Sequence, residues 1–353
     1  MQGPRNPIVD PEFKALLNKN QRKKTLFKFL SDNKEVINSD NLSFILRRVR
    51  RYYPLDEEAH EEGMKILGEK IEELNAVGLS PYHISGILWS WSVKLPGEIR
   101  TKLVDSLCEK IDEATFIDVS QALNGLAKQK YDIESGNLEI IGRKLLSKDC
   151  GMQSISNSLW GFARMSHNLP QTTYYGFLEN FMHRIEDAKP IAISQLFDFA
   201  AKKMDLDGDT VETLIEHALS MPKECTSRVL AKILLDLSLM GSGKISKERQ
   251  RELLSLFLAK INEDSEPARI YDIQNVLSAA AGGSIEIEGE DFRVIFRHLG
   301  KIVNEDTPPN RLKRYREVMD DILSLVIKMD SSYPSSVHEV SSMIDTLKEK
   351  MEK

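Results

Sequence analysis

The chain has 353 residues, of which 41% are hydrophobic, and a formal net charge of −6. This length suffices for a large core, as one elongated domain or two compact ones, and no apolar run approaches the roughly 18 residues of a membrane span. With only 19 glycines and 13 prolines, long stretches run without a turn signal, which argues against a β-rich protein and favours helices.

Residues 1–40 are predicted to form a basic N-terminal arm with a capping helix. Residues 1–51 hold 12 Lys and Arg against 5 Asp and Glu, a net +7, whereas the rest of the chain holds 36 against 49, a net −13. Contact with a polyanion should therefore be confined to this basic segment. The aromatic residues between its cations are typical of a nucleic-acid surface. A capping repeat with a solvated polar face would have a similar composition. The candidate RNA contacts in this region are Arg22, Lys23, Lys24, Arg47, Arg48, Arg50 and Arg51.

An internal repeat runs through residues 41–283. A leucine recurs at spacings of 35, 36 and 37 residues in the four best copies, and at spacings of 38 to 43 residues in the outer copies. The residues four before and three after this leucine are apolar, and the residue four after it is usually small, so all share one helix face. The small residue should let a partner helix approach closely. These register leucines are Leu46, Leu88, Leu123, Leu159, Leu196, Leu234 and Leu277.

A second amphipathic helix follows the first in each repeat, for example at residues 98–111, 138–146 and 211–219. Ser80 before Pro81 is typical of a helix start, with an N-cap and then proline at the first helical position. Since neither helix of such a pair can bury its apolar face alone, the hairpins must stack. The sequence therefore predicts an all-α fold, an α-solenoid of helical-hairpin repeats of about 35–38 residues with helical caps.

After residue 284 the repeat fades, and three more helices are expected at residues 292–303, 311–329 and 337–352. We predict that residues 284–353 form a C-terminal helical cap, because the last repeat of a solenoid would otherwise expose an apolar face.

The repeats carry a short motif that is similar to a known one. Residues 159–163 read Leu-Trp-Gly-Phe-Ala and residues 88–92 read Leu-Trp-Ser-Trp-Ser. In this motif the chain resembles the octotricopeptide and heptatricopeptide class of organellar repeats, and the related repeats of FAST-kinase-like proteins, over about residues 41–283. Pentatricopeptide repeats are similar in length. Several members of the resembled class end in a RAP domain, a small α/β module, but no strand pattern follows residue 284.

The resemblance implies a mitochondrial protein that binds RNA without catalysis, with a plastid or the cytoplasm as alternative locations. Residues 1–14 have the features of neither a secretory signal nor an Arg- and Ser-rich transit peptide. Import into an organelle would therefore require an import sequence that was removed or is unusual.

A basic residue follows the repeat motif in five copies. On stacked hairpins these residues would form a ladder that tracks a phosphate backbone. Cations near a helix C-terminus also suit the helix dipole, and both explanations predict the same residue type. The five residues are Arg51, Lys94, Lys128, Arg164 and Lys202.

Serines and tryptophans also recur at fixed positions of the motif. The serines would either hydrogen-bond unstacked bases or satisfy free N–H groups in the first helical turn, and the second role is favoured. The tryptophans are expected in the core or between repeats, not as ligand-stacking residues. These residues are Ser43, Ser85, Ser120 and Ser156, and Trp89, Trp91 and Trp160.

No cofactor, metal site or catalytic residue is expected. The seven histidines are scattered, and residues 205–216 resemble a calcium loop but lack its glycine. Three widely spaced cysteines, Cys108, Cys150 and Cys225, predict buried free thiols in a reduced compartment.

The expected function is that of an organellar RNA-binding or mitoribosome-associated protein. It would contact single-stranded or ribosomal RNA together with other proteins of a ribonucleoprotein complex. The alternative is a protein–protein interaction scaffold, a subunit of a larger complex, which the acidic body of the chain supports.

Overall fold

The computed structural model describes residues 15, 30, 32–50, 57–76, 78–90, 96–241, 243–263, 268–304, 309–329 and 334–352. These residues form sixteen α-helices and two short 3-10 turns, and none of them lies in a β-strand, which confirms the predicted all-α class. The chain divides into two compact units, Met1–Met182 and His183–Lys353.

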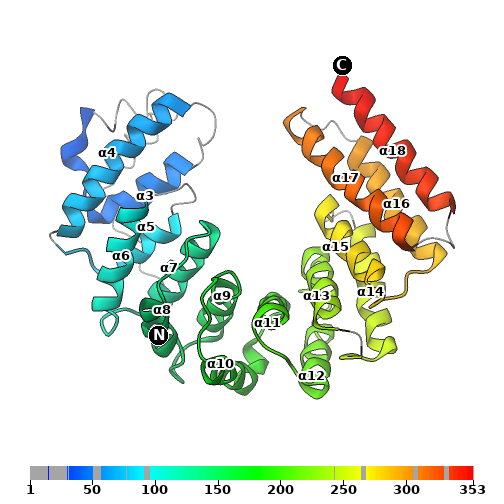
Figure 1. The fold of residues 1–353 in the computed structure, drawn as a ribbon, viewed down its shortest axis with the longest axis horizontal. Helices are drawn as coiled ribbons and strands as arrows, with labels where there is room; N and C mark the ends of the chain where they lie inside the picture. The colour runs from blue at the N-terminus through cyan, green and yellow to red at the C-terminus, as the bar shows by residue number, and fades with distance from the viewer. Residues whose placement is uncertain are drawn as a thin grey trace. The chain divides into compact units, whose positions relative to one another are not determined.

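The first unit contains eight helices among its described residues (Figure 1). Helices α3, α5, α7 and α9 form one row, in which each contacts the next, and α4, α6 and α8 form a second row in the same way. The elements are the 3-10 helix η1 (Lys34–Val36) and the eight α-helices α3 (Ser39–Arg50), α4 (Glu57–Ala76), α5 (Pro81–Ser90), α6 (Gly97–Glu109), α7 (Phe116–Lys128), α8 (Ser135–Leu145), α9 (Met152–Phe162) and α10 (Gln171–His183).

The second unit is built on the same plan. Its first row holds α11, α13, α15 and α17, and its second row holds α14, α16 and α18. The three helices expected after residue 284 are present, and they extend both rows. The elements are η2 (Ile185–Asp187), α11 (Pro190–Lys203), α12 (Gly208–Leu219), α13 (Ser227–Met240), α14 (Lys247–Asn262), α15 (Ile270–Ala281), α16 (Gly289–Asn304), α17 (Pro309–Met329) and α18 (Pro334–Glu352).

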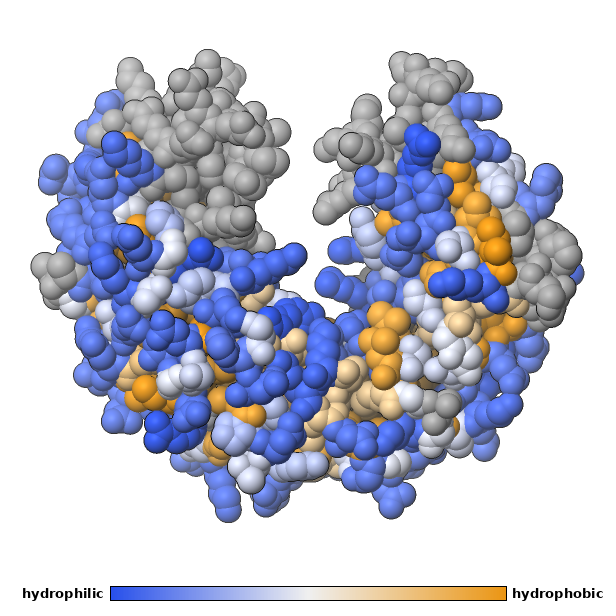
Figure 2. Space-filling model, in the orientation of Figure 1, coloured by the Kyte–Doolittle hydropathy of each residue, from blue (hydrophilic) through white to orange (hydrophobic). Residues whose placement is uncertain are grey.

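Within each unit, the contacts between successive helices of a row give a solenoid-like arrangement. All seven register leucines are buried, at 0% to 3% exposure, because the predicted apolar face of each first-row helix is its packing face. The described surface in Figure 2 is largely hydrophilic, with separate apolar patches. The boundary between the units falls inside the segment predicted as continuous repeats, where the sequence carries no linker signal.

The helix starts follow from local capping. Pro81 opens α5, and the Ser80 hydroxyl accepts a hydrogen bond from the backbone N–H of His83 at 3.4 Å, as predicted. Thr115 and Asp118 form a reciprocal capping box that begins α7. These polar contacts fix where α5 and α7 begin.

Two glycines set the distance between first-row helices. Gly125 and Gly161 each lie two residues after a register leucine. A Cβ at Gly125 would clash with the backbone of Leu88 and Trp89 in α5, and a Cβ at Gly161 would lie 2.6 Å from Cγ of Leu123. First-row helices therefore approach closely at these glycines, two residues after the register leucine, a position that the predicted motif had not singled out.

All three cysteines are buried, and none of them forms a disulfide, as predicted. Burial raises the pKa of Cys108 to about 12 and that of Cys225 to about 11, so both thiols stay protonated at neutral pH. Among the described residues, no helix is both long and apolar enough to cross a membrane.

Candidate nucleic-acid interface

Three of the predicted RNA contacts have described side chains: Lys128, Arg164 and Lys202. Arg47, Arg48 and Arg50 lie in the last turns of α3, but their side chains are outside the described part of the structure. The remaining predicted contacts lie outside the described residues altogether, and they are Arg22, Lys23, Lys24, Arg51 and Lys94.

Lys128 and Arg164 belong to an alternating series of cations and indoles in the first unit, here named the cation–indole ladder. It consists of Trp89, Lys128, Trp160 and Arg164. Nζ of Lys128 lies 5.5 Å from the ring centre of Trp89 and 5.9 Å from that of Trp160. The guanidinium carbon of Arg164 lies 3.7 Å from the ring centre of Trp160. These distances are within the range of cation–π attraction.

The ladder crosses three consecutive first-row helices. Trp89 is in the last turn of α5, Lys128 is the last residue of α7, and Trp160 is in the last turn of α9. Nη1 of Arg164 donates a hydrogen bond to the carbonyl oxygen of Trp160 at 2.9 Å, which fixes the guanidinium beside the ring. The stacking of the hairpins therefore aligns residues that are 32 to 39 positions apart in the chain.

The two described tryptophans are not core residues. Trp89 and Trp160 are half-buried, whereas the register leucines just before them are fully buried. They do make the expected contacts between repeats, because Lys128 of α7 lies over the indoles of both neighbouring helices. Trp91 lies outside the described residues.

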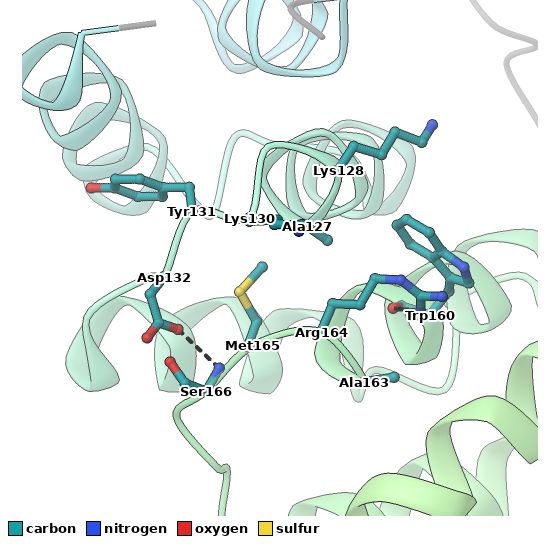
Figure 3. A pocket seen from close by; sticks show the side chains of 10 residues that line it. All are labelled: Ala127, Lys128, Lys130, Tyr131, Asp132, Trp160, Ala163, Arg164, Met165 and Ser166. Carbon is teal, nitrogen blue, oxygen red and sulfur yellow. Dashed lines mark hydrogen bonds between the residues drawn. The ribbon is translucent and has the colours of Figure 1, made fainter. Parts of the chain in front are cut away.

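A pocket of about 690 Å³ opens beside the ladder, between the C-terminal ends of α7 and α9. Figure 3 shows Trp160 and Arg164 on one side of it, Asp132 and Ser166 on the other, and Met165 between them. Its lining residues are Ala127, Lys128, Lys130, Tyr131, Asp132, Trp160, Ala163, Arg164, Met165 and Ser166.

Polar contacts hold the side of the pocket that contains Asp132. A carboxylate oxygen of Asp132 accepts a hydrogen bond from the backbone N–H of Ser166 at 3.0 Å. The hydroxyl of Tyr131 hydrogen-bonds with that of Thr101 at 2.7 Å, and the guanidinium of Arg100 lies 4.7 Å from the Tyr131 ring centre. The loop after α7 is therefore tied both to α6 and to the loop after α9.

The serine ladder has an internal role. Ser85, Ser120 and Ser156 are buried, and each hydroxyl donates to the backbone carbonyl three residues earlier, at 2.9 to 3.2 Å. Their burial makes base recognition by these hydroxyls unfavourable. The hydrogen bonds also differ from the predicted ones. The serine hydroxyls were expected to accept from backbone N–H groups, but they donate to backbone carbonyls. The side chain of Ser43 is outside the described part.

Lys202 lies in the second unit and contacts a buried carboxylate. Its Nζ lies 2.7 Å from Asp198, whose side chain is 2% exposed. Nζ of Lys232 lies 2.8 Å from Asp198 and also pairs with Asp236, whose side chain is fully buried. Burial raises the pKa of Asp236 to about 6, although the neighbouring ammonium groups lower it. These four residues form an internal ionic network between α11 and α13.

No known protein family matches this chain, and no curated protein matches it either. The chemistry of the ladder and the pocket is therefore the basis for assigning a function. Exposed or half-buried cations beside half-exposed indoles can bind phosphates and stack bases at the same time.

Several residues of the pocket are not among the predicted RNA contacts: Lys130, Tyr131, Asp132 and Ser166. A signal was present, because the segment 128–132 reads Lys-Gln-Lys-Tyr-Asp and combines basic and aromatic residues directly after a helix. The repeat pattern predicts one cation in each copy and does not extend into the loop that follows that cation.

Proposed function

We propose that this chain binds single-stranded or ribosomal RNA, without catalysis, through the cation–indole ladder of its first unit. The observation that carries the proposal is the position of Lys128, whose ammonium lies within 6 Å of the ring centres of two half-exposed tryptophans from neighbouring helices.

The ladder suits a single strand better than a duplex. Bases of a single strand are free to stack on aromatic faces, and each such contact contributes about 1–3 kcal/mol with little dependence on base identity. Lysine and arginine beside the rings attract the phosphates. An indole face carries no formal charge and still attracts a cation. Lys202 and Lys232 lie beside buried aspartates, whose negative charges offset theirs.

The proposal includes the repeat architecture, with hairpins of about 35–38 residues stacked as in the octotricopeptide and heptatricopeptide class. A recurring contact supports it. Side chains at the second helix of a hairpin donate to the loop that precedes the same hairpin. Examples are Lys110 to the carbonyl of Leu79 at 2.8 Å, His217 to Ala188 at 3.0 Å and His298 to Ala268 at 3.0 Å.

A mitochondrial location and partners in a ribonucleoprotein complex complete the proposal. Both rest on the resemblance of residues 159–163, Leu-Trp-Gly-Phe-Ala, and residues 88–92, Leu-Trp-Ser-Trp-Ser, to the motif of that organellar repeat class.

A binding titration tests the RNA function. The full chain is titrated into a short fluorescein-labelled oligouridylate, and anisotropy gives the Kd at several salt concentrations. We expect Lys128→Gln combined with Arg164→Gln to weaken binding about tenfold or more and to lower the salt slope by about 1 to 2. The matched control is Arg143→Gln combined with Lys223→Gln, two exposed cations away from the ladder. Equal affinity of the two double variants would remove the ladder from the interface.

A protein-scaffold role is the second candidate. It is favoured by exposed apolar side chains at the second residue of three first-row helices: Ile117 at 40% exposure, Ile191 at 51% and Tyr271 at 40%. Purification from cells with sequencing of crosslinked RNA separates the two roles. A stable protein partner without crosslinked RNA would favour the scaffold.

A further inference from the structure

We propose that the pocket between the ends of α7 and α9 receives one unstacked nucleotide of the bound strand. This inference rests on the proposed RNA function and adds a defined subsite to it. The phosphate of the nucleotide would lie among Lys128, Lys130 and Arg164, and its base would enter the pocket beside Trp160.

The size of the pocket and the residues around it suit this ligand. Its volume of about 690 Å³ lies within the range of about 300–1,000 Å³ that is typical of small-molecule sites. Three of its ten lining residues are cations, and the indole of Trp160 provides a stacking surface backed by the Arg164 guanidinium at 3.7 Å. Aromatic rings and arginine planes are the surfaces on which proteins stack bases that leave a strand.

The charges of the pocket set the orientation of the nucleotide. Asp132 is its one acidic lining residue, and Figure 3 shows it across the pocket from Trp160 and Arg164. The backbone N–H of Ser166 holds the carboxylate there, with a donor–acceptor distance of 3.0 Å. A phosphate is repelled at that side and attracted by the cations, so the base is the part that points toward Asp132.

The backbone conformation of Lys130 is independent support for a binding role of its side chain. Lys130 has φ of +53°, which makes it the one residue other than glycine with a left-handed φ in the described part of the chain. Its N–H bonds the carbonyl of Ala127 and the next N–H, of Tyr131, bonds that of Leu126, both at 3.1 Å. This is the Schellman ending of a helix, in which the left-handed position is usually glycine.

Lysine at this position is the less stable choice for the backbone, because a side chain disfavours a left-handed φ. The same turn places the residue on the rim of the pocket. A backbone conformation that is unfavourable for its residue is typical of functional sites. If Lys130 served only to end the helix, glycine at this position would make the folded protein more stable.

The substitution Lys130→Gly therefore separates the two roles. It keeps the turn, since glycine adopts a positive φ readily, and we expect the Tm to rise by about 2 °C. We also expect the Kd for the labelled oligouridylate to weaken about fivefold, because one phosphate contact is lost. Lys130→Asn, which also tolerates this conformation, should weaken binding similarly. Unchanged affinity in both variants would overturn the proposal.

A crosslinking experiment distinguishes failure of the subsite from failure of the RNA function. The full chain is irradiated with an oligouridylate that contains 4-thiouridine, and the crosslinked peptides are identified by mass spectrometry. Crosslinks in residues 127–132 or 160–166 are expected. Tight binding with crosslinks confined to other segments would reject the pocket and leave the RNA function standing. No binding by the unmodified chain would reject both.

Discussion

Gly125 of α7 lies directly against the backbone of Leu88 in α5, so closely that a Cβ at this position would clash with the Leu88 carbonyl oxygen. The same contact brings Lys128, one turn further along α7, to the indole of Trp89. A backbone contact inside the core thus determines the spacing of a surface ladder.

We predict that Gly125→Ala destabilises the protein by about 2 kcal/mol or more, because α5 and α7 must move apart to admit the methyl group. The loss should be visible as a lower midpoint in chemical denaturation followed by circular dichroism. The matched control is Gly136→Ala in α8, where a Cβ meets no atom within 4 Å. That change should be neutral or slightly stabilising, since alanine is the better helix former. Equal midpoints for the two variants would contradict the close contact.

The ionic network between α11 and α13 predicts a specific pH dependence. The pKa of Asp236 is about 6 in the folded protein, above its ordinary value of 3.8, because burial penalises the carboxylate. A raised carboxyl pKa means that the folded state binds the proton more tightly than the unfolded state does. The contribution of Asp236 to stability is therefore fully present below about pH 4 and is lost as the pH rises through about 6.

Asp236→Asn removes this titration while keeping the shape of the side chain. We expect the stability of the variant relative to the unmodified protein to rise between about pH 5 and about pH 7.5, by on the order of 1 kcal/mol. Urea denaturation at the two pH values measures it. The exposed Asp320→Asn in α17 serves as the control and should show a smaller change. A relative stability of Asp236→Asn that does not vary with pH would contradict the raised pKa.

The buried cysteines should be unreactive in the folded protein. Burial raises the pKa of Cys108 and Cys225 to about 12 and about 11, and the thiolate is the form that reacts. We expect iodoacetamide at neutral pH to leave Cys108, Cys150 and Cys225 unmodified over a time in which a free cysteine reacts fully. All three should be alkylated in guanidinium. Mass spectrometry of the intact chain counts the adducts, and rapid labelling of the native protein would show that the thiols are accessible.

The helices were largely predictable, because they depend on local spacing. Leu123 and Leu159 belong to a leucine repeat that is evident in the sequence, and both are fully buried on the predicted helix face. The three helices after residue 284 were also expected where they occur. The predicted roles of individual motif residues were less accurate, since Ser85, Ser120 and Ser156 bond carbonyls inside the helices.

The sequence by itself determined the helical class and the register of the buried leucines, because the apolar periodicity shows which face of each helix must be removed from water. The wide spacing of the three cysteines also predicted buried thiols. Only the tertiary structure decided which side chains surround each cation. Lys128 and Lys202 both follow the motif, five and six residues after their register leucines. Lys128 lies near two indoles, and Lys202 pairs with Asp198. Asp198 lies four residues before Lys202 in the same helix, whereas the indoles near Lys128 come from the neighbouring helices α5 and α9, which a single repeat does not contain.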